Sequence, residues 1–507
     1  MSHLLHAVRS LSADELADFR LQFAKKGKQA KGFRLFNLIC RRGDELKNIR
    51  ELMPELYDQQ DRKSFNKLCS RLTDELIQFI VRRHLRDAWM QSTGHEVMLT
   101  AAQHMYRKGL YAESAHYLQR AETIALTFRD PAALIRIYDY MLEHAVPLNI
   151  SSTIISNKMS KCLGEYVRWF QLKLLASSFR EDNQILRSKG NRLDMKQNLR
   201  WAKQQMQLTE DEWNNPGCMV YVFDVVRSSA SSTKNYLVAE RFMESNYKRL
   251  NRQNRFTSAD KSSELKLLWM TAHAKYRNGK FDLARNWIEL YKAKSDNYQE
   301  HENIYLVRYA LLRAAIECYS GHLDQAITLA KNALRKHGKQ GLAEDLINLK
   351  LNLAVYHFFD RNFKRALALL NEIDAEFIGQ AGRMGKEWTF KKDMITLLTH
   401  YELADDEVAI AMLKQVKKTN QHDLFTKPGY QNAAKFVELL TESFRNPLKT
   451  TSRAFHNKVK AVSDQWSQQV HDIQAIAFFS WLKSKMNDED CYEVMLRSLR
   501  EMKVKRS

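Results

Sequence analysis

The sequence predicts an all-α protein, an α-solenoid of stacked antiparallel helix pairs with helical caps at both ends. Three observations predict it. The chain of 507 residues contains only 16 Gly and 6 Pro, too few for the tight turns of a sandwich or barrel. Apolar residues recur with helical spacing along the chain. A short phrase also returns every 40–43 residues in the second half, which is typical of repeat proteins.

The first 92 residues form a predicted N-terminal helical unit. Leu16, Phe19 and Phe23 share one face of a helix over 12–24, and Phe33 opens a second apolar helix. A third helix over 63–83 carries an apolar stripe of Phe65, Leu68, Leu72, Leu76, Phe79 and Ile80. These three helices are enough to enclose a small core of their own.

The recurring phrase is a small turn residue, an apolar residue two positions later and an alanine three positions beyond that. It occurs as Gly279-Lys-Phe281-Asp-Leu-Ala284, and its later alanines are Ala326, Ala366 and Ala409, at steps of 42, 40 and 43 residues. An earlier copy ends in a serine, Ser114.

Small residues at this spacing have a physical purpose. Two antiparallel helices approach closely only where a small side chain faces the partner backbone, and a glycine can end a helix in the left-handed conformation. Upstream helices supply matching small residues, Ala102, Ala272, Ala314 and Ala354. Because a single pair cannot bury its apolar face, the pairs are expected to stack.

The phrase resembles the tetratricopeptide repeat over residues 98–130 and, more fully, over 265–420. That family implies a helical-repeat fold that binds partners on a concave surface. The period here exceeds the family's 34 residues, and no proline lies between Pro216 and Pro428. The opening Leu11-Ser12-x-x-Glu15-Leu16-x-x-Phe19 also resembles the leading segment of bacterial repeat proteins of the Bacteroidota type.

The remaining segments follow from these signals. Residues 93–264 are expected to form irregular hairpins that include one degenerate repeat, with breaks at Pro131, Pro147 and Pro216 and a loop over Ser228–Thr233. Residues 265–420 hold the repeats, and 421–507 read as C-terminal capping helices.

Charge and cysteine spacing set further expectations. Eighty Lys and Arg against 59 Asp and Glu give a net charge of +21, spread along the chain, which favours an anionic partner. The six cysteines lie 29 or more residues apart, so we expect reduced thiols in a cytoplasmic protein. No apolar run approaches 18 residues, so no membrane span is expected.

No catalytic or cofactor motif is apparent. The glycines of Gly379-Gln-Ala-Gly382-Arg-Met-Gly385-Lys386 lack phosphate-loop spacing, and we interpret them as an inter-helix connection. Asp488-Glu-Asp490 is interpreted as an exposed acidic turn. We therefore expect neither an enzyme nor a cofactor or metal site.

Two basic patches are candidate contacts for an anionic partner. One surrounds the loop after the first helices, and the other follows one face of a helix near 236–256: Lys25, Lys26, Lys28, Lys31 and Arg34, then Arg241, Lys248, Arg252 and Arg255. Such runs are usually solvated faces. Single-strand binding would also need stacking aromatics, but Phe242, Tyr247, Trp269 and Trp287 have the spacing of core residues.

The sequence thus favours a non-catalytic adaptor that binds a protein or peptide partner, with an acidic one preferred. Its predicted contacts lie on the first helix of successive pairs: Lys275, Arg313, Glu317, Lys350 and His357. The alternative is a nucleic-acid- or ribosome-associated protein that uses the basic patches. The partner's identity and the oligomeric state are left open.

Overall fold

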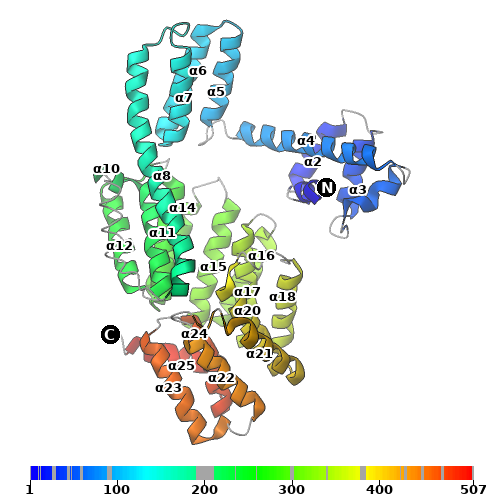
Figure 1. Cartoon of the computed structure of the whole chain (residues 1–507), viewed down its shortest axis with the longest axis vertical. Coiled ribbons are helices and arrows are strands. Elements are labelled where there is room, and N and C mark those ends of the chain that lie inside the picture. Colours follow the sequence, from blue (N-terminus) through cyan, green and yellow to red (C-terminus); the bar gives the residue numbers. More distant parts are fainter. Residues whose placement is uncertain are drawn as a thin grey trace. The chain divides into compact units, whose positions relative to one another are not determined.

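The structure is a computed structural model and is helical throughout its described part (Figure 1). It describes residues 2–9, 11, 13–24, 30–42, 46, 48–57, 61–87, 94–189, 210–233, 236–257, 260–296, 302–338, 341–376, 384–422, 424–426, 431–446, 450–469 and 473–504. No strand occurs within these ranges. The predicted fold class, an all-α stack of helix pairs, is confirmed.

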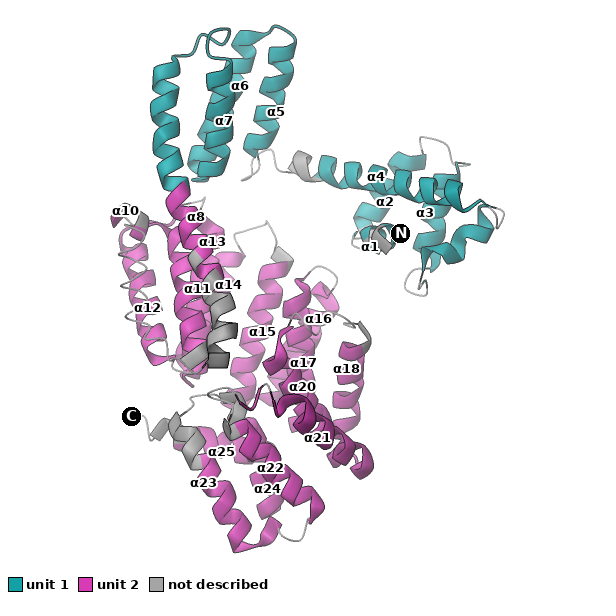
Figure 2. Ribbon diagram, viewed as in Figure 1, with its two compact units in different colours: residues 1–166 teal, residues 167–507 magenta. Residues whose placement is uncertain are grey.

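The chain divides into two compact units, Met1–Tyr166 and Val167–Ser507 (Figure 2). The sequence predicts a division into four segments instead of two, and that finer division stays a prediction.

Unit 1 contains two separate apolar cores. Phe19 lies at the centre of the first, with its ring centroid 4.9 Å from Phe36 and 5.2 Å from Phe79. The second is built around the hairpin of α5 and α6 and around α7. The helices of the unit are α1 (Ser2–Arg9), α2 (Ala13–Ala24), α3 (Lys31–Arg42), the 3₁₀ helix η2 (Ile49–Glu55), α4 (Arg62–Asp87), α5 (Gly94–Arg107), α6 (Tyr111–Thr127), α7 (Pro131–Glu143) and the start of α8 (Ser152–Lys189).

Unit 2 continues from α8 as consecutive hairpins around one extended core. Within it α13 packs on α14, α15 on α16, α17 on α18 and α20 on α21, and each first helix also contacts the first helix of the next pair. Its helices are α10 (Glu210–Trp213), α11 (Pro216–Thr233), α12 (Leu237–Arg252), α13 (Lys261–Arg277), α14 (Phe281–Ser295), α15 (Glu302–Ser320), α16 (Leu323–His337), α17 (Ala343–Phe359), α18 (Phe363–Glu376), α20 (Lys386–Glu402), α21 (Asp406–Asn420), α22 (Gln431–Arg445), α23 (Arg453–Gln469), α24 (Ile473–Asn487) and α25 (Cys491–Val504).

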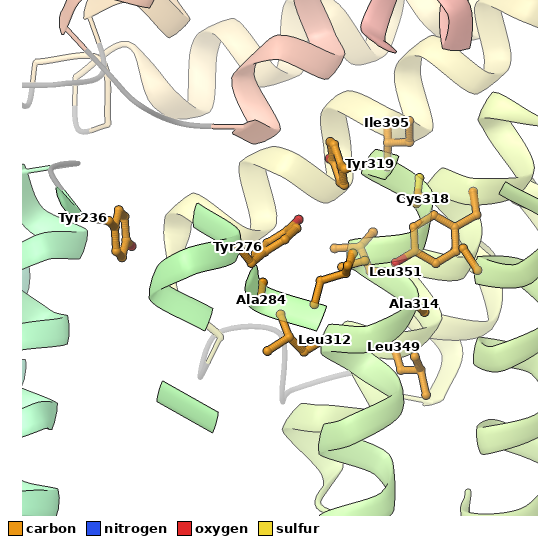
Figure 3. Packing of buried hydrophobic residues seen from close by; sticks show 14 of the residues in the cluster. Tyr236, Tyr276, Ala284, Leu312, Ala314, Cys318, Tyr319, Leu349, Leu351 and Ile395 are labelled. Carbon is orange, nitrogen blue, oxygen red and sulfur yellow. The ribbon is translucent and has the colours of Figure 1, made fainter. Parts of the chain in front are cut away.

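The recurring alanines lie where the sequence placed them, between the two helices of each pair. Every alanine of the phrase and every upstream partner has an exposed fraction of 0%. Figure 3 shows Ala284 and Ala314 among larger buried side chains such as Leu312 and Leu349. In the degenerate copy, the Ser114 hydroxyl donates to the Ala102 carbonyl at 2.9 Å, so the buried polar atom is satisfied.

The hairpin turns share one backbone device. One residue in the turn after the helix adopts a positive φ, and the N–H of the following residue donates to the carbonyl five residues earlier, for example Lys280 to Lys275 at 3.0 Å. The positive-φ residues at these turns are Gly109, Arg129, Asn149, Asn254, Gly279, Gly321, Arg361, Ala404 and Asp488.

The predicted loop over Ser228–Thr233 is wrong, because these residues form the last turns of α11. Ser229 and Ala230 are each only 1% exposed. Their small side chains let α11 pack closely on its neighbours, so tertiary packing overrides a weak local helix preference.

Candidate functional site

A cavity of about 770 Å³ opens in unit 2 along the first helices of successive hairpins. Its walls come from α11, α13, α15, α17 and α20, and α24 from the C-terminal region supplies a further wall. Residues more than 250 positions apart therefore line one space, from Val220 on α11 to Trp481 on α24.

Aromatic side chains make up much of the apolar part of the lining. They include Trp269, Tyr276, Tyr319, Tyr356, Phe478 and Trp481. The Trp269 indole N–H donates to the Arg308 carbonyl at 3.3 Å, which fixes the ring between α13 and α15. Asn348 and Asn352 add amide groups to the same wall.

Cations outnumber anions in the lining. Arg227, Lys266, Arg277, Arg308 and Lys391 face the cavity against Asp224, Glu344 and Asp345. Arg308 pairs with Asp345 at 2.9 Å and Arg227 with Asp224 at 3.2 Å. Lys266 forms no ion pair with any described residue, and its side chain is exposed. The cavity therefore carries a surplus of positive charge at its α11–α15 side.

His273 lies on this positive side. Its ring stacks on Trp269 with centroids 5.2 Å apart and planes inclined by 10°. Its Nδ1 is buried and has no hydrogen-bond partner among the described residues. Burial, together with the nearby Arg277 and Arg227, holds the pKa of His273 well below its ordinary value, so the ring is neutral at pH 7.

The C-terminal helices are anchored beside the cavity. The Trp481 indole donates to Glu402 at 2.6 Å, and Lys485 contacts the same carboxylate at 2.7 Å. The Tyr492 hydroxyl donates to the Cys318 carbonyl at 2.6 Å. These bonds tie α24 and α25 to α20 and α15.

The predicted partner contacts on the first helices are placed differently from the solvent-facing positions that the sequence suggested. Lys275, Glu317 and His357 are 1%, 2% and 2% exposed. Lys275 pairs with Glu240 at 3.1 Å and Glu244 at 2.6 Å, and Glu317 pairs with Arg285 at 3.1 Å.

The physical reason is their position in the last turn of each first helix. There the side chain points into the seam with the preceding pair, where a charge needs a partner. Arg313 is bonded to Glu289 at 2.7 Å and also pairs with Glu317, while Lys350 lies 3.7 Å from Glu372. As contacts for a partner, all five remain a prediction.

The structure describes only part of the first basic patch and all four residues of the second. Lys25, Lys26 and Lys28 lie outside the described residues. Lys31 lies over the Tyr57 ring, 3.7 Å from its centroid, and Arg34 donates to the Glu55 carbonyl at 3.5 Å.

On α12 the side chains of Arg241, Lys248 and Arg252 are exposed, and Arg255 follows that helix, half-buried. Lys248 pairs with Glu244 at 2.7 Å. A contact between either patch and an anionic partner stays a prediction.

Sequence reasoning missed the cavity. Trp269 was interpreted as a core residue, whereas it is only partly buried and lines the cavity. The available signal was the 3–4 spacing of Trp269, His273 and Tyr276 on α13, a second apolar face beside the one that contains Ala272. A helix with two apolar faces can pack on its hairpin partner with one face and line a cavity with the other.

Other expectations concern residues outside the cavity. All six cysteines are free thiols. No group of three His, Cys, Asp or Glu in the described part of the chain could hold a metal ion. None of the helices that the structure describes is both long and apolar enough to cross a bilayer. Gly379 and Gly382 fall outside the described residues.

The chain matches no family model and no curated protein. Among solved structures it is similar to the Rap conjugation gene regulator of the plasmid pLS20 in complex with the Phr* peptide. The two are 12% identical, with a TM-score of 0.44, and the alignment covers 81% of this chain and 95% of that chain. Similarity at this level carries no functional inference.

Proposed function

We propose that this chain is a non-catalytic helical-repeat protein that binds an extended peptide segment of a partner in the cavity of unit 2, with an acidic segment preferred. The observation that carries the proposal is the cavity itself, with the aromatic residues and the surplus of cations in its lining. Its volume falls within the range of about 300–1,000 Å³ typical of ligand pockets.

An extended peptide suits the way in which the walls are built. Packed helices lie about 8–10 Å apart, whereas an extended chain advances by roughly 3.3 Å per residue. Each hairpin along the cavity would thus meet about three residues of a peptide. Asn348 and Asn352 can bond to peptide backbone groups, and the aromatic rings can receive apolar side chains.

The charge of the lining also favours an acidic segment. Lys266 and the arginines of α11 and α13 would attract carboxylates.

The test is selection of peptides from a random library by the purified full chain, followed by a cavity-filling variant. Leu311 lines the cavity and is partly buried, so Leu311→Trp should abolish binding of the selected peptides. Leu290 on α14 is 39% exposed and lies outside the lining, so Leu290→Trp is the matched control.

Peptides that bind Leu311→Trp as tightly as the wild type would place the binding site elsewhere. Melting curves of both variants establish that each remains folded.

A further inference from the structure

We propose that the cavity contains a subsite for one carboxylate group of the bound peptide, between α11 and α13, formed by Arg227, His273 and Arg277. The inference rests on the proposed function, since it names the chemistry that this cavity selects. It commits to a glutamate or aspartate side chain as the occupant.

His273 supplies the first observation. Nδ1 is buried without a partner, and a buried polar atom of this kind is costly unless something satisfies it. The ring cannot turn freely, because it stacks on Trp269 and its centroid also lies 6.2 Å from Tyr236 and 6.3 Å from Tyr276. The nitrogen is therefore held in a fixed position, and in the tautomer that protonates Nδ1 it can donate to an oxygen atom.

Arg227 supplies the second observation. One terminal nitrogen of its guanidinium binds Asp224 at 3.2 Å, but its Nε is buried and has no hydrogen-bond partner among the described residues. Arg227 lies on α11 and His273 on α13, so two residues that each contain a buried atom without a partner line the same cavity from separate helices.

The described charges around these atoms favour an anion. Arg227 and Arg277 are both cations close to His273, and Asp224 is the carboxylate that binds Arg227. Arg277 is positioned by the Tyr236 ring, whose centroid lies 4.8 Å from the guanidinium carbon. A carboxylate would balance this charge and accept hydrogen bonds from both guanidinium and imidazole groups.

Two defined peptide mixtures test the subsite on the full chain. Both consist of N-acetylated hexapeptide amides whose third residue is Glu in one mixture and Gln in the other, with the remaining positions drawn from Ala, Leu, Tyr and Ser. We expect the wild type to retain the Glu mixture about 10-fold more tightly, as a charge-assisted hydrogen bond allows.

Arg227→Gln and His273→Phe should each reduce this preference to below about 2-fold while the Gln mixture binds as before. Arg335→Gln, on the exposed face of α16 and outside the lining, removes the same charge and should keep the full preference. His273→Gln gives a second variant if His273→Phe fails to fold, and melting curves decide this.

The remaining outcomes separate the two proposals. If the wild type retains both mixtures equally, or if the preference survives Arg227→Gln and the His273 variants, the carboxylate subsite is overturned while peptide binding stands. If the wild type retains neither mixture, the proposed function itself fails.

Discussion

Buried charges at the ends of two first helices hold successive hairpins together. Lys275 and Glu317 occupy equivalent places, 42 residues apart. Lys275 reaches back to Glu240 and Glu244 on α12, and Glu317 reaches Arg285 on α14. A buried ion pair contributes little net stability when intact, but removing one partner strands the other charge.

We therefore expect Lys275→Ala to destabilise the chain by about 3 kcal/mol, because Glu240, 2% exposed, would lose its buried cation and keep Lys280, at 3.0 Å, as its ion-pair partner. The matched control is Lys248→Ala, which removes an exposed lysine bound to Glu244 at 2.7 Å and should cost less than ~1 kcal/mol. Urea unfolding followed by circular dichroism measures both. Equal losses would mean that the Lys275 pair is solvated.

These residues also show why the sequence did not predict the burial of Lys275 and Glu317. Sequence spacing identifies which residues share a helix face, but it does not tell a face that contacts the previous hairpin from one that faces solvent. Lys275 and Glu317 are charged, so composition favours exposure, and only their partners on neighbouring hairpins reverse this.

At the scale of single elements, the hairpin turns combine one backbone conformation with several residue types. Gly109 has a φ of +74° and nothing within 4 Å of an added Cβ, so a substitution there probes the backbone alone. Ala404 has a φ of +61° at the equivalent turn.

This backbone conformation costs a non-glycine residue roughly 1–2 kcal/mol of free energy. Gly109→Ala should therefore destabilise unit 1 by about 1 kcal/mol, whereas Ala404→Gly should stabilise unit 2 by a similar amount. Thermal melting of the two variants checks the opposite signs. The same sign for both would contradict the positive-φ geometry at one of the turns.

The buried alanines between the two helices of each pair allow these helices to pack closely. Ala326 is fully buried between α16 and α15, and Thr328, two residues later, is exposed. Ala326→Leu should destabilise the fold by about 1–3 kcal/mol through overpacking, and Thr328→Leu should leave stability nearly unchanged. Urea midpoints of the two variants provide the comparison, and a tolerated Ala326→Leu would mean that the seam is loosely packed.

The elements were predictable where the signal is local and repeated. The alanine phrase predicts the hairpins from α13 to α21 because each pair needs the same small contact. The turns at Arg129, Asn149 and Asn254 were not singled out, because their positive φ is adopted by residues other than glycine. The helical end of α11 was missed because its serines are stabilised by packing rather than by helix propensity.

At the scale of the whole molecule, the cavity could not be predicted because its walls come from helices far apart in the sequence. Trp269 and Trp481 are separated by more than 200 residues, yet they line the same space. Binding of a nucleic acid or a ribosome stays a prediction. It depends on the net charge of the whole chain and on basic patches that the structure describes only in part. Titration with RNA and DNA at two salt concentrations, on protein purified without nuclease, tests it directly.

Net charge has a further consequence for peptide capture. A chain of charge +21 attracts an acidic peptide over long range, so the field accelerates encounter. At 0.01 M salt the Debye length is about 30 Å, and at 1 M it is about 3 Å. We expect the association rate of a selected acidic peptide to fall at least 10-fold between these conditions, as is typical of electrostatic steering. The dissociation rate should change less, because partly buried contacts in the cavity are poorly screened.

Stopped-flow fluorescence with a labelled peptide measures both rates. The control is the same peptide with Gln in place of Glu, whose association rate should depend less on salt. An association rate independent of salt would show that the surplus charge plays no part in capture.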